Sequence, residues 1–324
     1  MDSFYRKVYP RSWQTIKNNL AVLFFGLFAS ILGFQEMTII FNFNELEADF
    51  LSTTIMSLYE WISILAMTQI TLANAPAVLN LVIIFILFAV IIILAVASQG
   101  ALISSAADAV SKGKKSMGIY FSKHFQAGLE KFWPLLGLNL VNVLIGYFFV
   151  RLVVQPLIYF IIVSNTGPGL YLLLAIITFF ILIPLIVIIS FVTRYGAAYI
   201  ILKNQTFSKA FVNGWNLFKT NWIITVENAI FLVLITFIFF LIMFSAMVFA
   251  FVPFLILSIL ISSTTLVYWL IILIGSLVAV IIFILATGAF GAYYNIIWAN
   301  VWIQLTSKGK SHSKLHRATR KYLH

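Results

Sequence analysis

Six stretches of this chain are each long and apolar enough for a helix to cross a bilayer, which takes about 20 residues. Only 9% of the 324 residues are charged and 63% are hydrophobic, whereas a soluble surface needs roughly 25–35% charged residues. Lipid must therefore cover the chain, and we expect the first stretch to be a retained span rather than a removed signal. The stretches are Asn19 to Phe41, Ala77 to Ser105, Pro134 to Val163, Tyr171 to Leu202, Trp222 to Ile261 and Leu266 to Leu305.

Several of these stretches are longer than a span requires, so we expect them to tilt, to kink or to project into the cytoplasm. Pro156, Pro184 and Pro253 are candidate kink sites, because proline removes a helical hydrogen bond. The fifth stretch is longer than the four that precede it, so we expect a break in it at Pro253.

Lysine and arginine are distributed unevenly over the loops that six spans would create. Of the 20 Lys and Arg residues, 18 fall on one side, which the positive-inside rule makes cytoplasmic. Both termini are accordingly predicted to be cytoplasmic, in a multi-pass protein of the cell (cytoplasmic) membrane. The opposite side carries no cation and four acidic residues, Glu45, Glu47, Asp49 and Glu60.

The segment from Phe50 to Leu72 bears on this number of spans. Leu51, Ile55, Leu58 and Ile62 follow a helical spacing among polar residues, which favours an amphipathic helix on the outer surface. A re-entrant helix or a seventh span is the alternative, but a seventh span would place basic clusters on opposite sides of the membrane.

An internal repeat divides the chain. Residues 121–132 read FSKHFQAGLEKF and residues 207–218 read FSKAFVNGWNLF, at an offset of 86 positions. Asn142 and Asn228 share this offset, and both are predicted to form hydrogen bonds between helices. A weaker third copy near the N-terminus matches Lys7, Trp13 and Lys17.

The repeated segment predicts a surface helix that leads into a span. Phe121, Phe125, Leu129 and Phe132 lie on one helical face, and aromatic faces with flanking lysines suit the cytoplasmic headgroup layer. Bends into the spans are expected at Pro134 and Asn221, and Pro10 should leave the N-terminal copy short.

The repeat predicts an all-α polytopic membrane helix bundle with pseudo-threefold order. Each of three units would hold a surface helix and two spans, and the small residues that end the second spans would let helices approach closely. The predicted boundaries are 1–111, 112–203 and 204–305 within a single transmembrane domain, followed by a basic cytoplasmic tail, 306–324.

Four ionisable residues fall within the predicted spans, and such residues are candidates for function by default. Glu36 and Arg151 would lie in the outer leaflet, where they could pair. Arg194 and Glu227 would lie in the inner half and could also pair, with Asp108 nearby. We interpret the pairs as locks between helices; a polar site for an ion or a lipid headgroup is the alternative.

The sequence contains no catalytic motif, no cysteine and no predicted cofactor or metal site. His312 and His316 have metal-ligand spacing but lie in a tail without acidic residues, so we expect them to be solvated. His124 has Ala210 at its repeat equivalent, so we expect this histidine to be incidental. Cations next to spans indicate anionic lipid as the partner, not nucleic acid. The candidate headgroup contacts are Lys123, Lys209, Lys219, Arg317, Arg320 and Lys321.

The repeated F-x-x-G-x-x-x-F pattern, as in Phe125-Gly128-Phe132 and Phe211-Gly214-Phe218, resembles a group of six-span prokaryotic membrane proteins. The group includes the membrane domain of some glycerophosphodiester phosphodiesterases and proteins of unknown function. The sequence has no counterpart of the phosphodiesterase catalytic domain, so the resemblance implies an architecture and no activity.

We therefore expect a non-enzymatic integral membrane protein, a scaffold or lipid-interacting module, with a membrane-protein partner or a second copy of the chain as further possible partners. The alternative is a transporter or channel for a small solute or lipid.

Overall fold

The computed structural model describes residues 4–33, 75–108, 117–149, 183–261 and 265–307, together with positions 176 and 180. Within these ranges the elements are helices, and the chain is an all-helical membrane bundle, as predicted. The helices are α1 (Phe4–Asn18), α2 (Ala21–Gly33), α5 (Ala75–Asp108), α6 (Met117–Glu130), α7 (Phe132–Phe149), α10 (Ile183–Lys203), α11 (Phe207–Thr220), α12 (Trp222–Ile261) and α13 (Thr265–Thr306).

Four of the described helices, α5, α10, α12 and α13, are long and apolar enough to cross a membrane. A fifth span results if α1 and α2, which are bent by 117°, are taken together, and α7 contains a shorter apolar helix. Parts of the first, third and fourth predicted stretches, and the segment Phe50 to Leu72, lie outside the described residues. The number of six spans therefore stays a prediction.

Three short helices, α1, α6 and α11, are each separated by one or two residues from the apolar helix that follows. The bend at Asn221 is confirmed: its backbone N–H donates to Leu217 and Phe218, and its carbonyl accepts from Thr225 as α12 starts. The bend expected at Pro134 occurs at Lys131 instead. Proline is tolerated in the first turn of a helix, where its missing N–H has no helical partner, so α7 continues through Pro134.

Two further expectations about proline were wrong. α12 runs unbroken through Pro253, since the apolar medium leaves a helix no better way to satisfy its backbone groups. α1 is 15 residues long with Pro10 inside it, against 14 residues for α6. Contacts made by its neighbours hold α1 in place: Ser12 accepts a 2.9 Å hydrogen bond from Asn300 of α13, and the Tyr5 ring packs against Phe231 of α12.

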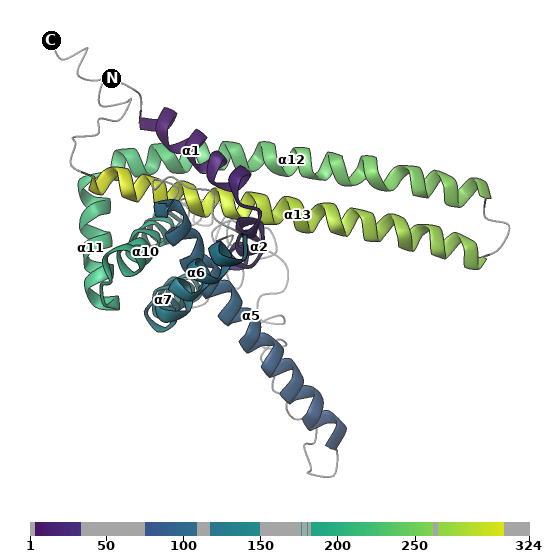
Figure 1. Cartoon of the computed structure of the whole chain (residues 1–324), viewed down its shortest axis with the longest axis horizontal. Coiled ribbons are helices and arrows are strands. Elements are labelled where there is room, and N and C mark those ends of the chain that lie inside the picture. Colours follow the sequence, from purple (N-terminus) through teal and green to yellow (C-terminus); the bar gives the residue numbers. More distant parts are fainter. Residues whose placement is uncertain are drawn as a thin grey trace, which may run out of the picture.

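The short helices pack along long helices in a cyclic order: α6 along α5, α11 along α10, and α1 along α13. Figure 1 shows α1, α6 and α11 gathered with the C-terminal ends of α10 and α13, a region that we call the packed end. The third contact joins the first helix to the last and closes this arrangement. The threefold repeat itself and its unit boundaries stay predictions.

Glycine permits the close approach of helices at the packed end. A Cβ atom at Gly128 of α6 would collide with the backbone carbonyl of Ala97 in α5, and one at Gly214 of α11 would lie 2.6 Å from the carbonyl oxygen of Val192 in α10. These two glycines are equivalent in the sequence repeat. In α11 the buried face includes Ala210 and Gly214, whereas in α6 it combines Gly128 with the larger side chains of Tyr120 and His124.

The phenylalanine face of the surface helices was expected to lie among lipid headgroups, and for α6 this was wrong in part. Phe121 stacks on Phe25 of α2 with ring centroids 4.9 Å apart, and Phe125 stacks on the same ring at 6.2 Å. Leu129 and Trp215, by contrast, are exposed, at 41% and 46%. The aromatic face thus contributes to packing between helices as well as to the outer surface.

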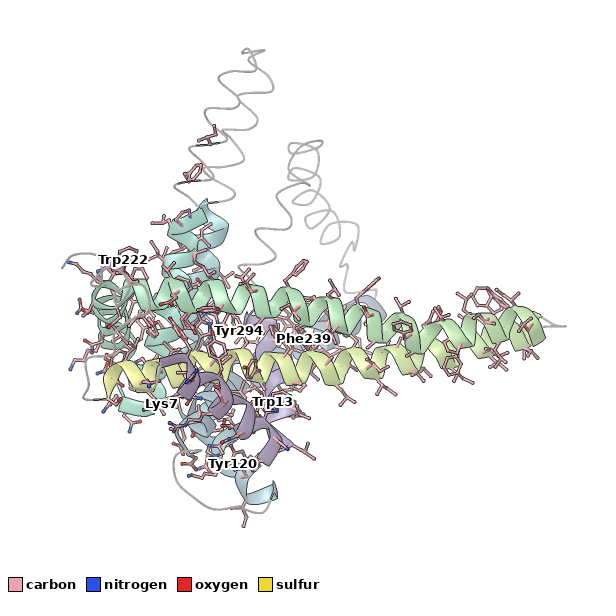
Figure 2. The ribbon with its side chains drawn as sticks, turned by 90° about the horizontal axis from the view of Figure 1, so that it is seen from above. Lys7, Trp13, Tyr120, Trp222, Phe239 and Tyr294 are labelled. Atoms are coloured by element: carbon pink, nitrogen blue, oxygen red, sulfur yellow. The ribbon has the colours of Figure 1, made fainter. Side chains whose placement is uncertain are left out.

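Away from the packed end, the described helices diverge. α12 and α13 leave as a hairpin, while the N-terminal half of α5 leaves in another direction (Figure 1). Apolar side chains cover these outer parts, as seen along the hairpin in Figure 2; Phe85, Phe249 and Leu260 are more than 70% exposed. The buried polar residues concentrate at the packed end, and any functional site among the described residues is to be sought there.

Candidate functional site

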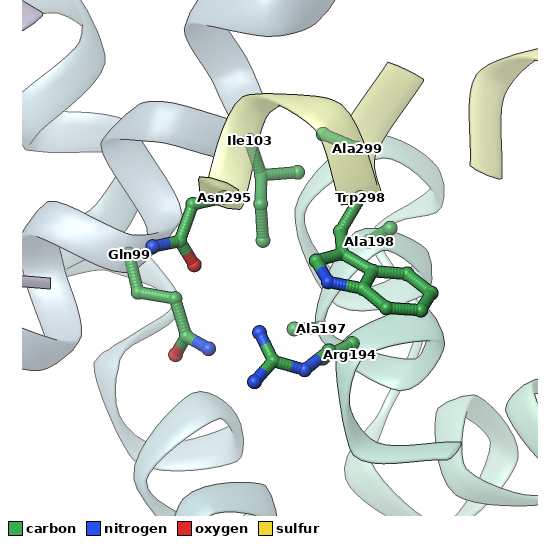
Figure 3. A pocket seen from close by; sticks show the side chains of 8 residues that line it. All are labelled: Gln99, Ile103, Arg194, Ala197, Ala198, Asn295, Trp298 and Ala299. Atoms are coloured by element: carbon green, nitrogen blue, oxygen red, sulfur yellow. The ribbon is translucent and has the colours of Figure 1, made fainter. Parts of the chain in front are cut away.

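Three helices, α5, α10 and α13, enclose a small polar pocket at the packed end. Its cavity of about 10 Å³ has room for roughly one water molecule. Figure 3 shows the side chains of Gln99, Arg194 and Asn295 facing this space, with the indole of Trp298 at its side. The remaining lining residues are small or apolar: Ile103, Ala197, Ala198 and Ala299.

Arg194, one of the four predicted intramembrane ions, contributes the charge of this pocket. Its guanidinium carbon lies 4.7 Å from the ring centroid of Tyr294 and 5.6 Å from that of Trp298, which is the geometry of a cation–π interaction. Its Nε donates to the Ser190 hydroxyl, one helical turn earlier, at 3.3 Å. These contacts hold the cation against α13.

Amide side chains complete the polar lining. Asn139 of α7 donates to the Gln99 side-chain oxygen at 2.7 Å, which leaves the Gln99 Nε2 group as a donor. Asn295 donates to the Gly291 carbonyl of its own helix at 2.8 Å, which leaves its Oδ1 as an acceptor. The Trp298 Nε1 atom is buried without a hydrogen-bond partner among the described residues.

Glu227, the expected partner of Arg194, lies in a second polar cluster, between α12 and α1. The side chain is 9% exposed and lies close to Tyr5 and Tyr9. Burial raises the pKa of Tyr5, and the Glu227 carboxylate acts in the same direction. The contacts described for Arg194 and for Glu227 thus involve different neighbours, and their direct pairing stays a prediction.

Asn228 follows Glu227 and accepts a 3.1 Å hydrogen bond from the Tyr9 hydroxyl. This bond joins α12 to α1, so the interhelical role predicted for Asn228 is confirmed. The Oε2 atom of Glu227 and the Nδ2 atom of Asn228 are both buried without a hydrogen-bond partner among the described residues.

A third cluster joins α5 to α6 and was not anticipated. Asp108 forms an ion pair with Lys123 and lies 3.5 Å from the Nε2 of His124, whose Nδ1 is 2.9 Å from the Ser104 hydroxyl. His124 is completely buried. We interpreted His124 as incidental because Ala210 replaces it in the repeat; its i+4 spacing from Tyr120 and from Gly128 was the signal that it lies on the buried face.

The other predicted site residues lie in two groups. Lys209 and Lys219 are exposed on α11, and Lys123 is exposed although it pairs with Asp108. Glu36, Arg151, Arg317, Arg320 and Lys321 fall outside the described residues. The outer pair and the tail contacts therefore stay predictions.

Exposed tryptophans accompany the exposed cations at the packed end. Trp13 and Trp215 lie on surface helices, and Trp133 and Trp222 lie where the following helices begin; all four are exposed. Tryptophan favours the membrane–water interface. Measured along the helix axis, Glu227 lies about 8 Å beyond Trp222 in α12. Arg194 lies about 14 Å from Lys203, the last residue of α10.

The described residues contain no group of three or more His, Asp or Glu side chains that could hold a metal ion. No protein-family model, curated protein or solved structure matches the chain. The arrangement of polar and charged groups at the packed end is therefore the basis for inferring function.

Proposed function

We propose that this integral membrane protein is a non-enzymatic scaffold or lipid-interacting module that gathers anionic lipid around its cytoplasmic end. The supporting observation is the combination of exposed cations and exposed tryptophans on the surface helices and their junctions. The cations are Arg6, Lys7 and Lys17 on α1, Lys123 on α6, Lys203 at the end of α10, and Lys209 and Lys219 on α11.

This combination has a direct physical consequence at a bilayer. Tryptophan fixes the depth of a helix at the headgroup layer, and each nearby cation adds about 1 kcal/mol of attraction to an anionic surface. The proposal places both termini on the cytoplasmic side of a prokaryotic cell membrane, because the exposed cations belong to the segments that the positive-inside rule assigns to that side. The resemblance to six-span membrane domains agrees with this role but adds no activity to it.

Lipid enrichment tests the proposal. The full-length protein would be reconstituted into nanodiscs with equal parts of phosphatidylglycerol and phosphatidylcholine, and its retained lipid measured by native mass spectrometry. We expect phosphatidylglycerol to be enriched, and expect the double variant Lys209→Gln/Lys219→Gln to lower its affinity up to about 30-fold at low salt. Lys209→Arg/Lys219→Arg, which keeps both charges, is the matched control. Equal retention of the two lipids by the unmodified protein would contradict the proposal.

The alternative is a transporter or channel for a small solute or lipid, with Arg194 and Glu227, and Glu36 and Arg151 beyond the described residues, as pathway groups. A polar pocket between α5, α10 and α13 is the observation in its favour. The pocket admits about one water molecule, so passage would require these helices to separate. Solute flux into proteoliposomes that Arg194→Gln abolishes, without a change in lipid enrichment, would favour transport.

A further inference from the structure

A buried carboxylate lies in the second turn of α12, next to α1. Glu227 is only 9% exposed, and its Oε2 atom is enclosed without a hydrogen-bond partner among the described residues. Within this part of the chain Glu227 forms no ion pair. An anion removed from water in this way is costly unless positive charge compensates it. A compensating cation is therefore expected beside the Oε2 atom.

Oxygen atoms of uncharged side chains accompany this carboxylate. The phenols of Tyr5 and Tyr9, both in α1, lie close to Glu227. The Tyr9 hydroxyl donates its only proton to the Asn228 Oδ1 atom at 3.1 Å, so the lone pairs of the Tyr9 oxygen remain available to a ligand. The Asn228 side chain is completely buried, which fixes the direction of this hydrogen bond. The carboxylate and the phenols together offer oxygen ligands with a single negative charge.

Packing holds these side chains in place. The Tyr5 ring lies 5.2 Å from the Phe231 ring of α12 and 6.1 Å from the Tyr9 ring, measured between ring centroids. Tyr195 of α10 lies near Tyr5 and shares a 2.8 Å hydrogen bond with Thr225 of α12. The oxygen atoms thus belong to side chains that neighbouring helices already order, which lowers the entropic cost of binding a ligand.

We propose that Glu227 binds one monovalent cation between α12 and α1, with the phenol oxygens of Tyr5 and Tyr9 as uncharged ligands. A monovalent cation neutralises the single carboxylate, whereas a divalent ion would leave a buried excess of charge. Hard cations prefer oxygen ligands of this kind. The cation is a soluble Na⁺ or K⁺ ion or the ammonium group of a phosphatidylethanolamine headgroup. The site is separate from the exposed lysines of the surface helices, so it goes beyond the attraction to anionic lipid.

Stability that depends on the cation tests this site, because a ligand of the folded state alone stabilises it in proportion to its occupancy. The full-length protein, in a neutral detergent at pH 8, would be unfolded thermally while N-methyl-D-glucamine is replaced by Na⁺ or by K⁺ at constant ionic strength, which keeps general screening constant. Dihexanoyl phosphatidylethanolamine would be titrated in N-methyl-D-glucamine as the third probe. We expect a saturable rise in melting temperature of about 5 °C at 100 times the Kd.

Four variants test the assigned ligands. Glu227→Gln keeps the shape of the side chain without its charge and should abolish the rise; without the cation it should be at least as stable as the unmodified protein, since it buries no uncompensated charge. Glu130→Gln, at an exposed acid of α6, is the matched control and should keep the full rise. Tyr9→Phe removes one ligand oxygen and should weaken binding about tenfold, as for one contact to a charged group. Tyr5→Phe, which keeps the ring against Phe231, repeats this test at the other phenol.

The outcomes identify the cation and separate this site from an ion pair between helices. A rise with Na⁺ or K⁺ assigns the site to a soluble ion, and a rise with the lipid alone assigns it to a headgroup ammonium; each supports the site if Glu227→Gln abolishes it. If Glu227 paired with Arg194 instead, Glu227→Gln would lower stability at every cation concentration. That result, a rise that persists in Glu227→Gln, or melting temperatures independent of all three probes would overturn the site. Enrichment of phosphatidylglycerol through Lys209 and Lys219 would be unaffected by that failure.

Discussion

At the packed end, the close approach of two helices and the burial of polar side chains occur at the same place. Gly128 lets α6 touch the backbone of α5, and the adjoining turns of these helices carry the buried His124 and the ion pair between Asp108 and Lys123. Close approach by small residues is a general way to associate helices in lipid, where no hydrophobic force drives them together. Here the same approach also buries polar groups that need partners.

Replacement of Gly128 by alanine tests the close approach. The new methyl group would overlap the Ala97 carbonyl, a backbone atom that cannot rotate away, so Gly128→Ala should lower stability by about 1–3 kcal/mol, as overpacking does. Gly118→Ala is the matched control on the same helix, since a Cβ there meets no atom within 4 Å. That control should be neutral or stabilising by up to about 1 kcal/mol through helix propensity. Thermal loss of the helical circular dichroism signal in micelles would measure both; equal melting temperatures would contradict the contact.

Tyr120 predicts a dependence of stability on alkaline pH. Burial raises the pKa of this phenol, in α6, to about 12, and the Asp108 carboxylate acts in the same direction. The unfolded side chain ionises near pH 10, so its contribution is complete below pH 10 and is lost as the pH rises from about 10 to 12. The loss would approach about 3 kcal/mol. Denaturation measured across this range should show a steeper decline for the unmodified protein than for Tyr120→Phe; parallel curves would show that Tyr120 ionises normally.

At the scale of elements, α1 shows how tertiary contacts override a local signal. Pro10 lacks an N–H and crowds the carbonyl four residues before it, and a helix end near this position was the natural expectation. Contacts on either side of Pro10, from Tyr5 and Tyr9 to α12 and from Ser12 to α13, keep the helix continuous. Pro10 still lowers the stability of the protein, but contacts with neighbouring helices keep α1 helical.

Removal of this proline should therefore stabilise the protein. Pro10 is exposed, so Pro10→Ala deletes little packing and restores a backbone hydrogen bond; we expect a gain of up to about 3 kcal/mol. Ser12→Ala, which removes the acceptor used by Asn300, should act in the opposite direction. Chemical denaturation in mixed micelles would compare the three proteins. A less stable Pro10→Ala variant would mean that the ring itself is needed for packing.

At the scale of the whole molecule, helix length determines how the protein can sit in a bilayer. α12 contains 40 residues and is about 60 Å long, twice the hydrocarbon thickness of about 30 Å. It must tilt strongly or extend beyond the bilayer. The divergence of the hairpin from α5 (Figure 1) is compatible with strong tilt, because diverging helices cannot all be parallel to the membrane normal.

The absence of cysteine allows a clean test of orientation in the membrane. Lys209→Cys places a single thiol on α11, and Leu266→Cys places one at the far end of the hairpin; both native side chains are exposed. A membrane-impermeant maleimide added to intact cells should label Leu266→Cys and not Lys209→Cys, because the cations of α11 should be cytoplasmic. Inverted vesicles should give the reverse pattern. Labelling of Lys209→Cys in intact cells would invert the proposed topology.

The sequence by itself determined the class of the protein and some of its helix boundaries. Hydrophobic length and charge distribution are local quantities, so the start of α12 at Trp222 and the bend at Asn221 followed from the neighbouring residues alone. The repeat likewise singled out Gly128 and Gly214, although their packing role could not be read from it.

Only the tertiary structure decided which helical faces are buried and which polar groups meet. Arg194 and Trp298 are separated by more than a hundred residues, and Gln99 lies nearly as far away in the other direction along the chain. No local pattern encodes such encounters, because they depend on the order in which long helices pack. The continuity of α1 through Pro10 has the same origin, since contacts with distant helices outweigh the local preference.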